Sequence, residues 1–263
     1  MLILIYLLVG ALAGLLAGLF GIGGGIVIVP ILTITFQVLK FSPEVLTHMA
    51  IATSLATIAF TSISSVRGHH LKNAVDWPLV ARLSIGILFG AVMGAITAES
   101  LSGKDLQVAI GIFALMVAVH MGLGLEPRSV RSLPSSKVMV ASGGIIGCAS
   151  ALFGIGGGAI TVPFLTWFNH PIQRSVATAA ACGFPIAVVG AFSNLVTGWG
   201  NLDLPQNSAG YIYLPALAGI VVTSVPFARV GANLAHKLPA NILRKLFALL
   251  LVLVAIKFLS VNL

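Results

Sequence analysis

Apolar runs, interrupted by short breaks of charged residues, prolines and turn formers, follow one another along the whole chain. Taken between these breaks, the runs predict ten helical segments, with approximate ranges 2–20, 25–39, 44–66, 78–98, 105–123, 138–153, 157–168, 174–197, 211–229 and 241–260. The second and seventh span only 15 and 12 residues, fewer than the roughly 20 that a helix needs to cross a bilayer. Each is therefore expected to pair with the preceding segment as a helical hairpin that dips part-way into the membrane.

A glycine-rich motif stands inside each of these two hairpins. Residues 19–32 read LFGIGGGIVIVPIL and residues 152–165 read LFGIGGGAITVPFL, so ten of fourteen positions are identical at a spacing of 133. Both copies place glycines and a proline in hydrophobic sequence, where an ordinary membrane helix disfavours them. Interrupted hydrophobic segments at matching places in two halves indicate the binding site of a transporter.

The two halves match beyond this motif, since Thr53 within AIATS aligns with Thr178 within SVATA. The sequence therefore predicts two membrane repeats, residues 1–125 and 138–263, joined by a polar linker at 126–137. Because five segments are an odd number, the second repeat must enter the membrane from the opposite face. The expected fold class is an all-α polytopic membrane protein with two inverted five-segment repeats, each with a helical hairpin broken at a glycine-rich loop.

Composition and charge support a membrane location and predict its orientation. Hydrophobic residues make up 58% of the chain and charged residues 8%, against roughly 25% charge in a soluble domain. Alternating sides along the ten segments leaves only Lys40, Lys104 and Lys257 on one side. The other side carries the remaining eleven basic residues, which are Arg67, Lys72, Arg82, Arg128, Arg131, Lys137, Arg174, Arg229, Lys237, Arg244 and Lys245. The positive-inside rule makes that side, with the linker, cytoplasmic and places both termini outside.

The glycine loops are candidates for an anion site. A helix that begins at membrane depth exposes N–H groups with a partial positive charge, and glycines let a ligand approach the backbone closely. Inverted repeats would bring the two loops together near the midplane, so the primary site residues are Gly23, Gly24, Gly25, Gly156, Gly157 and Gly158. The alternative is that these glycines serve only close helix packing.

Hydroxyl groups in the apolar segments are secondary candidates. Thr53, Ser54 and Thr178 offer donors to anion oxygens, although such side chains often bond back to their own helix. His48 is a candidate for proton coupling, with a buried or interfacial histidine as the alternative.

The other reactive side chains have plainer interpretations. His69 and His70 fall in a predicted cytoplasmic loop and His236 lies beside Lys237, so all three are expected at the surface. Cys148 and Cys182 lie in apolar runs without metal or disulfide spacing. No acidic residue falls securely in mid-membrane, which disfavours a sodium or divalent-cation carrier built on carboxylates.

These motifs, their order and their spacing resemble the TauE/SafE sulfite-exporter family along essentially the whole chain. The resemblance rests on the two GIGGG motifs with Pro30 and Pro163 and on SVATAAACGFPIAVVG at 175–190 and GANLAHKLP at 231–239. Ala179 departs from a symmetrical site, because it stands where the first half has Ser54. The resemblance implies a bacterial inner-membrane permease for sulfur-containing anions such as sulfite, sulfonates, sulfoacetate or thiosulfate.

The predicted function is therefore a secondary transporter that exports sulfite or an organosulfonate. The alternatives are an anion channel and an uptake permease for thiosulfate or a sulfonate. An intramembrane enzyme is disfavoured, because no metalloprotease motif, nucleophile elbow or paired mid-membrane acids occur. A net charge of +8 does not indicate nucleic-acid binding, since the basic residues are scattered. No cofactor or metal is expected, and the candidate partners are the anion, the lipid bilayer and a second copy in a homodimer.

Overall fold

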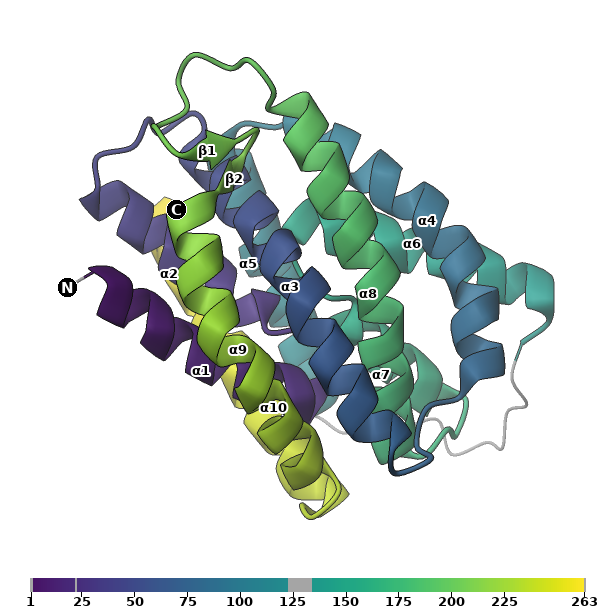
Figure 1. The fold of residues 1–263 in the computed structure, drawn as a ribbon. Coiled ribbons are helices and arrows are strands. Elements are labelled where there is room, and N and C mark those ends of the chain that lie inside the picture. Colours follow the sequence, from purple (N-terminus) through teal and green to yellow (C-terminus); the bar gives the residue numbers. More distant parts are fainter. Residues whose placement is uncertain (1, 22, 123–133, 263) are drawn as a thin grey trace.

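The computed structural model describes residues 2–21, 23–122 and 134–262, which form ten α-helices and one short antiparallel strand pair (Figure 1). The elements are α1 (Leu2–Phe20), α2 (Gly25–Val38), α3 (Leu46–His70), α4 (Trp77–Glu99), α5 (Gly103–Gly122), α6 (Ser136–Phe153), α7 (Gly158–Trp167), α8 (Ile172–Thr197), β1 (Ser208–Ala209), β2 (Ile212–Tyr213), α9 (Leu214–Ala235) and α10 (Ala240–Asn262). Each predicted segment corresponds to one helix. Most of the predicted linker lies outside the described residues, and α6 already begins at Ser136.

The ninth segment differs most from its predicted range of 211–229. Its first three residues are not helical, because Ser208 pairs with Tyr213 and Ala209 with Ile212 in a hairpin that turns at Gly210 with a positive φ of 52°. At the other end, Arg229 does not stop the helix, which continues to Ala235. The Arg229 side chain is exposed, so its long apolar stem can lie along the helix while the guanidinium reaches a polar region.

Helices α3 and α8 lie side by side and form the centre of the molecule (Figure 1). Helix α1 packs on α9, as α6 packs on α4, and α3 packs on α9, as α8 packs on α4. The short helices follow the same order, since α2 packs on α3 and α7 packs on α8. The contacts are therefore preserved when each helix of the first half is exchanged for its equivalent in the second half, so that α1 takes the place of α6, α2 that of α7, and so on.

Small residues let the outer helix pairs approach closely. Gly10, Gly14 and Gly18, spaced by four residues on α1, lie against the backbone of α9. Gly86, Gly90 and Gly94 repeat this spacing on α4 and lie against the backbone of α6. Small residues at this spacing are typical of helix pairs in membranes.

Seven of the described helices, α1, α3, α4, α5, α6, α8 and α9, are long and apolar enough to cross a membrane. Helices α2 and α7 are shorter, with 14 and 10 residues. Large apolar side chains such as Phe89, Phe192 and Val222 are exposed on the outer helix faces. In a membrane these faces would meet lipid instead of water.

Candidate functional site

Left-handed glycines make the two loops that separate α1 from α2 and α6 from α7. The φ angles are +70°, +70° and +81° at Gly21, Gly23 and Gly24, and +69° and +78° at Gly154 and Gly157. Side chains other than glycine rarely adopt this backbone conformation. Gly24 and Gly157 are the N-cap residues of α2 and α7, and no side chain caps either helix.

The two loops contact each other, although 133 residues separate them in sequence. A Cβ atom added at Gly23 would lie 3.3 Å from the Cα atom of Gly156, and one added at Gly25 would collide with the carbonyl oxygen of Gly154. Gly156 also packs against α8, where a Cβ atom on Gly183 would lie 2.8 Å from its carbonyl oxygen. All six candidate glycines are buried, so this conformation encloses the loops.

Ser54 joins the halves at this contact. Its hydroxyl donates a hydrogen bond to the carbonyl oxygen of Gly154 over 2.7 Å, and its side chain is fully buried. The sequence predicted Ser54 as a donor to an anion. In this conformation the donor is engaged by the second glycine loop.

Thr53 and Thr178 have equivalent roles at the beginning of two other helices. The Thr53 hydroxyl accepts from the backbone N–H of Tyr213 over 2.9 Å, and the Thr178 hydroxyl accepts from that of Asp76 over 3.1 Å. Tyr213 and Asp76 immediately precede α9 and α4. Each threonine therefore anchors the first residues of a helix in the other half of the chain, and neither is seen to bond a glycine loop.

Comparison with known proteins agrees with this architecture. The model of the sulfite exporter TauE/SafE family matches residues 6–258. The chain belongs to that family. It is therefore a multi-pass membrane transporter and not an enzyme.

Several curated relatives resemble this TauE/SafE family member along most of its length. A Haemophilus influenzae protein is 42% identical over 97% of this chain and 97% of its own length. A Methanocaldococcus jannaschii protein is 27% identical over 90% and 88%, and the Bacillus subtilis protein YunE is 28% identical over 74% and 78%. Each is named a probable membrane transporter protein. No solved structure matches the chain.

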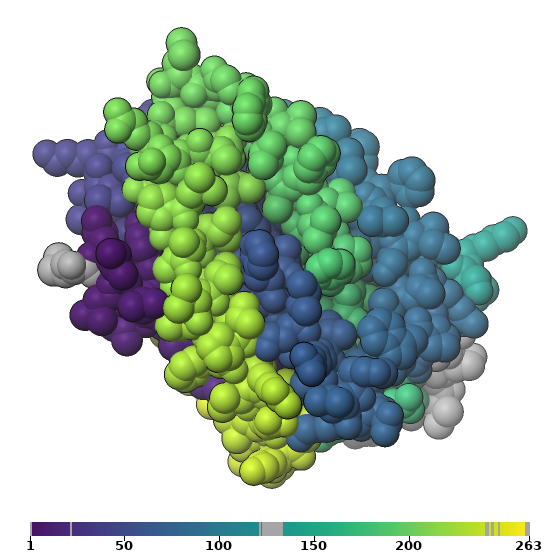
Figure 2. Space-filling view, in the orientation of Figure 1, coloured from purple at the N-terminus to yellow at the C-terminus, as the bar shows by residue number. Residues whose placement is uncertain are grey.

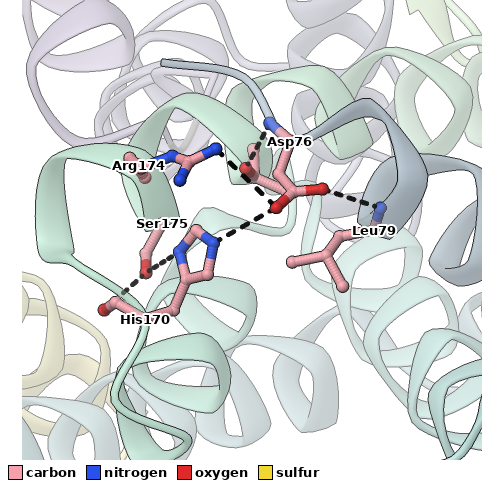
Figure 3. Close-up of polar contacts among 6 residues, drawn as sticks. Asp76, Leu79, His170, Arg174 and Ser175 are labelled. Carbon is pink, nitrogen blue, oxygen red and sulfur yellow. Dashed lines mark hydrogen bonds and ion pairs between the residues drawn. The ribbon is translucent and has the colours of Figure 1, made fainter. Parts of the chain in front are cut away.

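In this TauE/SafE transporter, Asp76 ties the beginning of α4 to the loop before α8 (Figure 3). One carboxylate oxygen caps α4 by accepting from the N–H of Leu79 over 3.2 Å. The other lies 3.5 Å from His170 Nε2 and 3.9 Å from a nitrogen of Arg174. The sequence places a proline near the beginning of each of these helices, at Asp76–Pro78 and at His170–Pro171, but it does not show that they meet, because Asp76 lies 94 positions before His170 in the chain.

Ser175 extends the cluster but is not arranged as a nucleophile. Its hydroxyl donates to the carbonyl oxygen of His170 over 3.2 Å, so the hydroxyl oxygen accepts from His170 Nδ1, also at 3.2 Å. A catalytic serine would instead give its proton to the histidine. The Asp, His and Ser side chains therefore form a structural connection between the beginning of α4 and the beginning of α8.

Replacing Asp76 with alanine is expected to lower the Tm of the purified protein more than replacing it with asparagine. Asparagine can still cap α4, whereas alanine also removes the cap, which is worth about 0.5–2 kcal/mol. Both variants lose the partly exposed ionic contacts, worth about 0.2–1 kcal/mol. Thermal unfolding in one detergent measures both values. Equal Tm values for the two variants would contradict the capping role.

The prediction that His69 lies at the surface is wrong. Helix α3 continues past residue 66 to His70, and this turns His69 inward, where its side chain is fully buried. His69 Nε2 donates to the carbonyl oxygen of Gly18 over 3.0 Å, and its Nδ1 lies 3.0 Å from His236 Nε2. His236 follows α9 and is partly buried, and this burial, together with the charge of Lys72, lowers its pKa. His70 is exposed, as predicted.

His48 lies at the opposite end of α3 and is 6% exposed. Its Nε2 approaches the carbonyl oxygen of Ala98 at 3.0 Å and its Nδ1 that of Glu44 at 3.2 Å. Since carbonyl oxygens only accept, the ring can satisfy both contacts only when it carries two N–H groups.

A polar cavity of about 370 Å³ borders His48 and is also lined by Glu44, Glu99, Asp203 and Tyr211. The Tyr211 hydroxyl donates to Glu99 over 3.0 Å. Burial raises the pKa of Tyr211, and the contact with Glu99 raises it further, so the phenol keeps its proton. Within the described residues, no three His, Cys, Asp or Glu side chains gather closely enough to hold a metal ion.

Proposed function

We propose that this TauE/SafE family member is a secondary transporter for a small sulfur-containing anion, and that it exports sulfite or an organosulfonate across a bacterial inner membrane. The contact between the two glycine loops, at Gly23 and Gly156, is the observation that carries this proposal. It lies between the two halves of the chain, where transporters built from repeats bind their substrates. The description of the family as sulfite exporters supports a sulfur-containing anion as the substrate.

The two halves, residues 1–125 and 138–263, act in this proposal as inverted repeats that rock against each other. The exchange of helix contacts between the halves supports this symmetry. Movement of one half would part the two loops and break the bond from Ser54 to Gly154. The freed hydroxyl, the N–H groups around Gly23 to Gly25 and Gly156 to Gly158, and the beginnings of α2 and α7 would then face one anion. No buried lysine or arginine is needed.

The proposed orientation places the ends of α3 and α9 in the cytoplasm and both termini outside. Contacts between loops support this assignment, because loops that were placed on the same side of the membrane meet in the structure. Asp76 meets His170 at one end of the molecule, and His69 meets His236 there too. At the other end, Tyr211 of the β1–β2 turn meets Glu99. Most of the basic residues belong to the first of these ends, which the positive-inside rule makes cytoplasmic.

His48 is the proposed site of proton coupling. Its two carbonyl contacts both accept hydrogen bonds, and the polar cavity beside it lies next to acidic side chains. Loss of a proton from His48 would break either its contact with Ala98 of α4 or its contact with Glu44, in the turn before α3. Ser54 lies further along the same helix, α3, and bonds the carbonyl oxygen of Gly154. A change in the contacts of His48 would therefore be transmitted along α3 to the glycine loops.

Purified protein in proteoliposomes tests the function. We expect saturable uptake and counterflow of sulfite or an alkanesulfonate, little transport of chloride, and faster flux under a proton gradient. His48→Gln is expected to abolish the effect of the gradient and to keep counterflow. Single-channel currents would identify an anion channel instead, and the absence of sulfur-anion flux would contradict the proposed function.

A further inference from the structure

A groove of about 350 Å³ runs between α3 and α8, near the end of α3. Four apolar side chains form its walls, and these are Ile63, Val66, Ala181 and Phe184. Arg67, His70 and Trp77 complete the lining. Helix α3 lies at the surface between α9 and α8 on this face of the molecule (Figure 2).

The groove faces away from the glycine loops. On α3 its lining recurs at positions 63, 66, 67 and 70, which is one helical face. Ile58, which contacts Gly23, falls on another face of α3. On α8, Gly183 packs against the second glycine loop and lies two positions after Ala181, which turns it about 160° around the helix. Ile63 is 55% exposed and Phe184 is 41% exposed, so the groove opens where lipid would lie.

The polar side chains of the groove offer donors to an anion. The indole N–H of Trp77 donates to His70 Nδ1 over 3.3 Å, which leaves the neutral imidazole with its hydrogen on Nε2. Among the described residues the ion pairs involve Asp76, and neither includes Arg67. Arg67, His70 and Trp77 lie at the ends of the α3 and α4 spans, which is the depth at which lipid headgroups lie.

We propose that this groove binds an anionic phospholipid. One acyl chain lies along the apolar walls, and the phosphate contacts the guanidinium of Arg67 and the Nε2–H of His70. Charge complementarity selects an anionic headgroup, because a guanidinium pairs with a phosphate through two parallel hydrogen bonds. The proposal does not depend on which anion the protein transports.

A second groove provides an internal comparison. It measures about 570 Å³ between α5, α6 and α7, and Trp167 stacks on His120 at its edge, with ring centroids 5.7 Å apart. No lysine or arginine is among the described residues that line it. It is therefore expected to take acyl chains without regard to headgroup charge.

Tryptophan quenching by brominated lipids tests the proposal, since the chain has only three tryptophans. A Trp167→Phe, Trp199→Phe variant reports on Trp77 in nanodiscs that contain brominated phosphatidylglycerol or, at the same mole fraction, brominated phosphatidylethanolamine. We expect phosphatidylglycerol to be enriched about fivefold at Trp77, the effect of one basic residue near an anionic headgroup. A Trp77→Phe, Trp199→Phe variant, which reports on Trp167, is expected to show no preference.

Arg67→Gln is expected to abolish the enrichment at Trp77. Arg82→Gln is the matched control, because Arg82 is an exposed residue on α4 that does not line the groove, and it should preserve the enrichment. Equal quenching by the two lipids at Trp77, or an equal loss in both arginine variants, would overturn the proposal. So would loss of quenching by both lipids at high protein density, which would indicate a second copy of the chain in the groove.

Discussion

Replacing Gly25 with alanine should reduce counterflow of the transported anion more than tenfold. Gly25 is the first residue of α2 and is not among the glycines with positive φ, so alanine fits its backbone. The added methyl group would nevertheless collide with the carbonyl oxygen of Gly154 and lie 2.9 Å from Ser54 Oγ. It would therefore enter the contact between the two loops. Overpacking of this kind costs about 1–3 kcal/mol, so Tm is also expected to fall.

Gly144→Ala is the matched control for this variant. Gly144 belongs to α6, and an added Cβ atom would have its nearest neighbour, the carbonyl oxygen of Gly86, at 3.8 Å. Transport and Tm should both stay near the wild-type values. Counterflow is measured per inserted molecule in proteoliposomes. Normal counterflow in Gly25→Ala would show that the contact between the loops is not part of the transport site.

The helices were largely predictable because a bilayer limits their length and requires an apolar surface. Breaks such as Ser42–Pro43 and Asp76–Pro78 stand close to the beginnings of α3 and α4. The glycine motif also located the two short helices, since it marks where α2 and α7 begin. These signals are local, and a single sequence contains them.

The features that the sequence did not reveal depend on distant partners. Ile212 and Tyr213 belong to the apolar run that α9 continues, yet they pair with β1 and so do not join the helix. His69 lies two positions after the charged Arg67, yet it shares a face with Ser62 and Ser65, both buried. That spacing of three and four among small polar residues was the available signal for an inward position.

The equivalent positions of Thr53 and Thr178 were visible in the sequence, but their role was not. Each hydroxyl is used by a backbone N–H more than 100 residues away. An alignment of the halves identifies such a pair without showing what it bonds. The threonines stay candidates for the anion site only if movement of the halves releases them from α9 and α4.

Ser54→Ala is expected to lower Tm and to raise the KM for the anion several-fold. The Ser54 hydroxyl bonds a carbonyl group 100 residues away, and both groups are buried. Leaving that carbonyl without its donor costs about 1–3 kcal/mol. The second half has no equivalent bond from this position, because Ala179 replaces the serine. The connection is therefore one-sided, and one substitution removes it.

Thr57→Val provides the control on the same helix. The Thr57 hydroxyl is equally buried but donates to the carbonyl of Thr53, within α3, over 2.8 Å. A helical carbonyl keeps its backbone donor when such a side-chain bond is lost, so smaller changes are expected. In the proposed cycle Ser54 bonds Gly154 in the closed state and the anion in the open state. Tm and KM should therefore both change in Ser54→Ala, and a lower Tm with an unchanged KM would exclude Ser54 from the anion site.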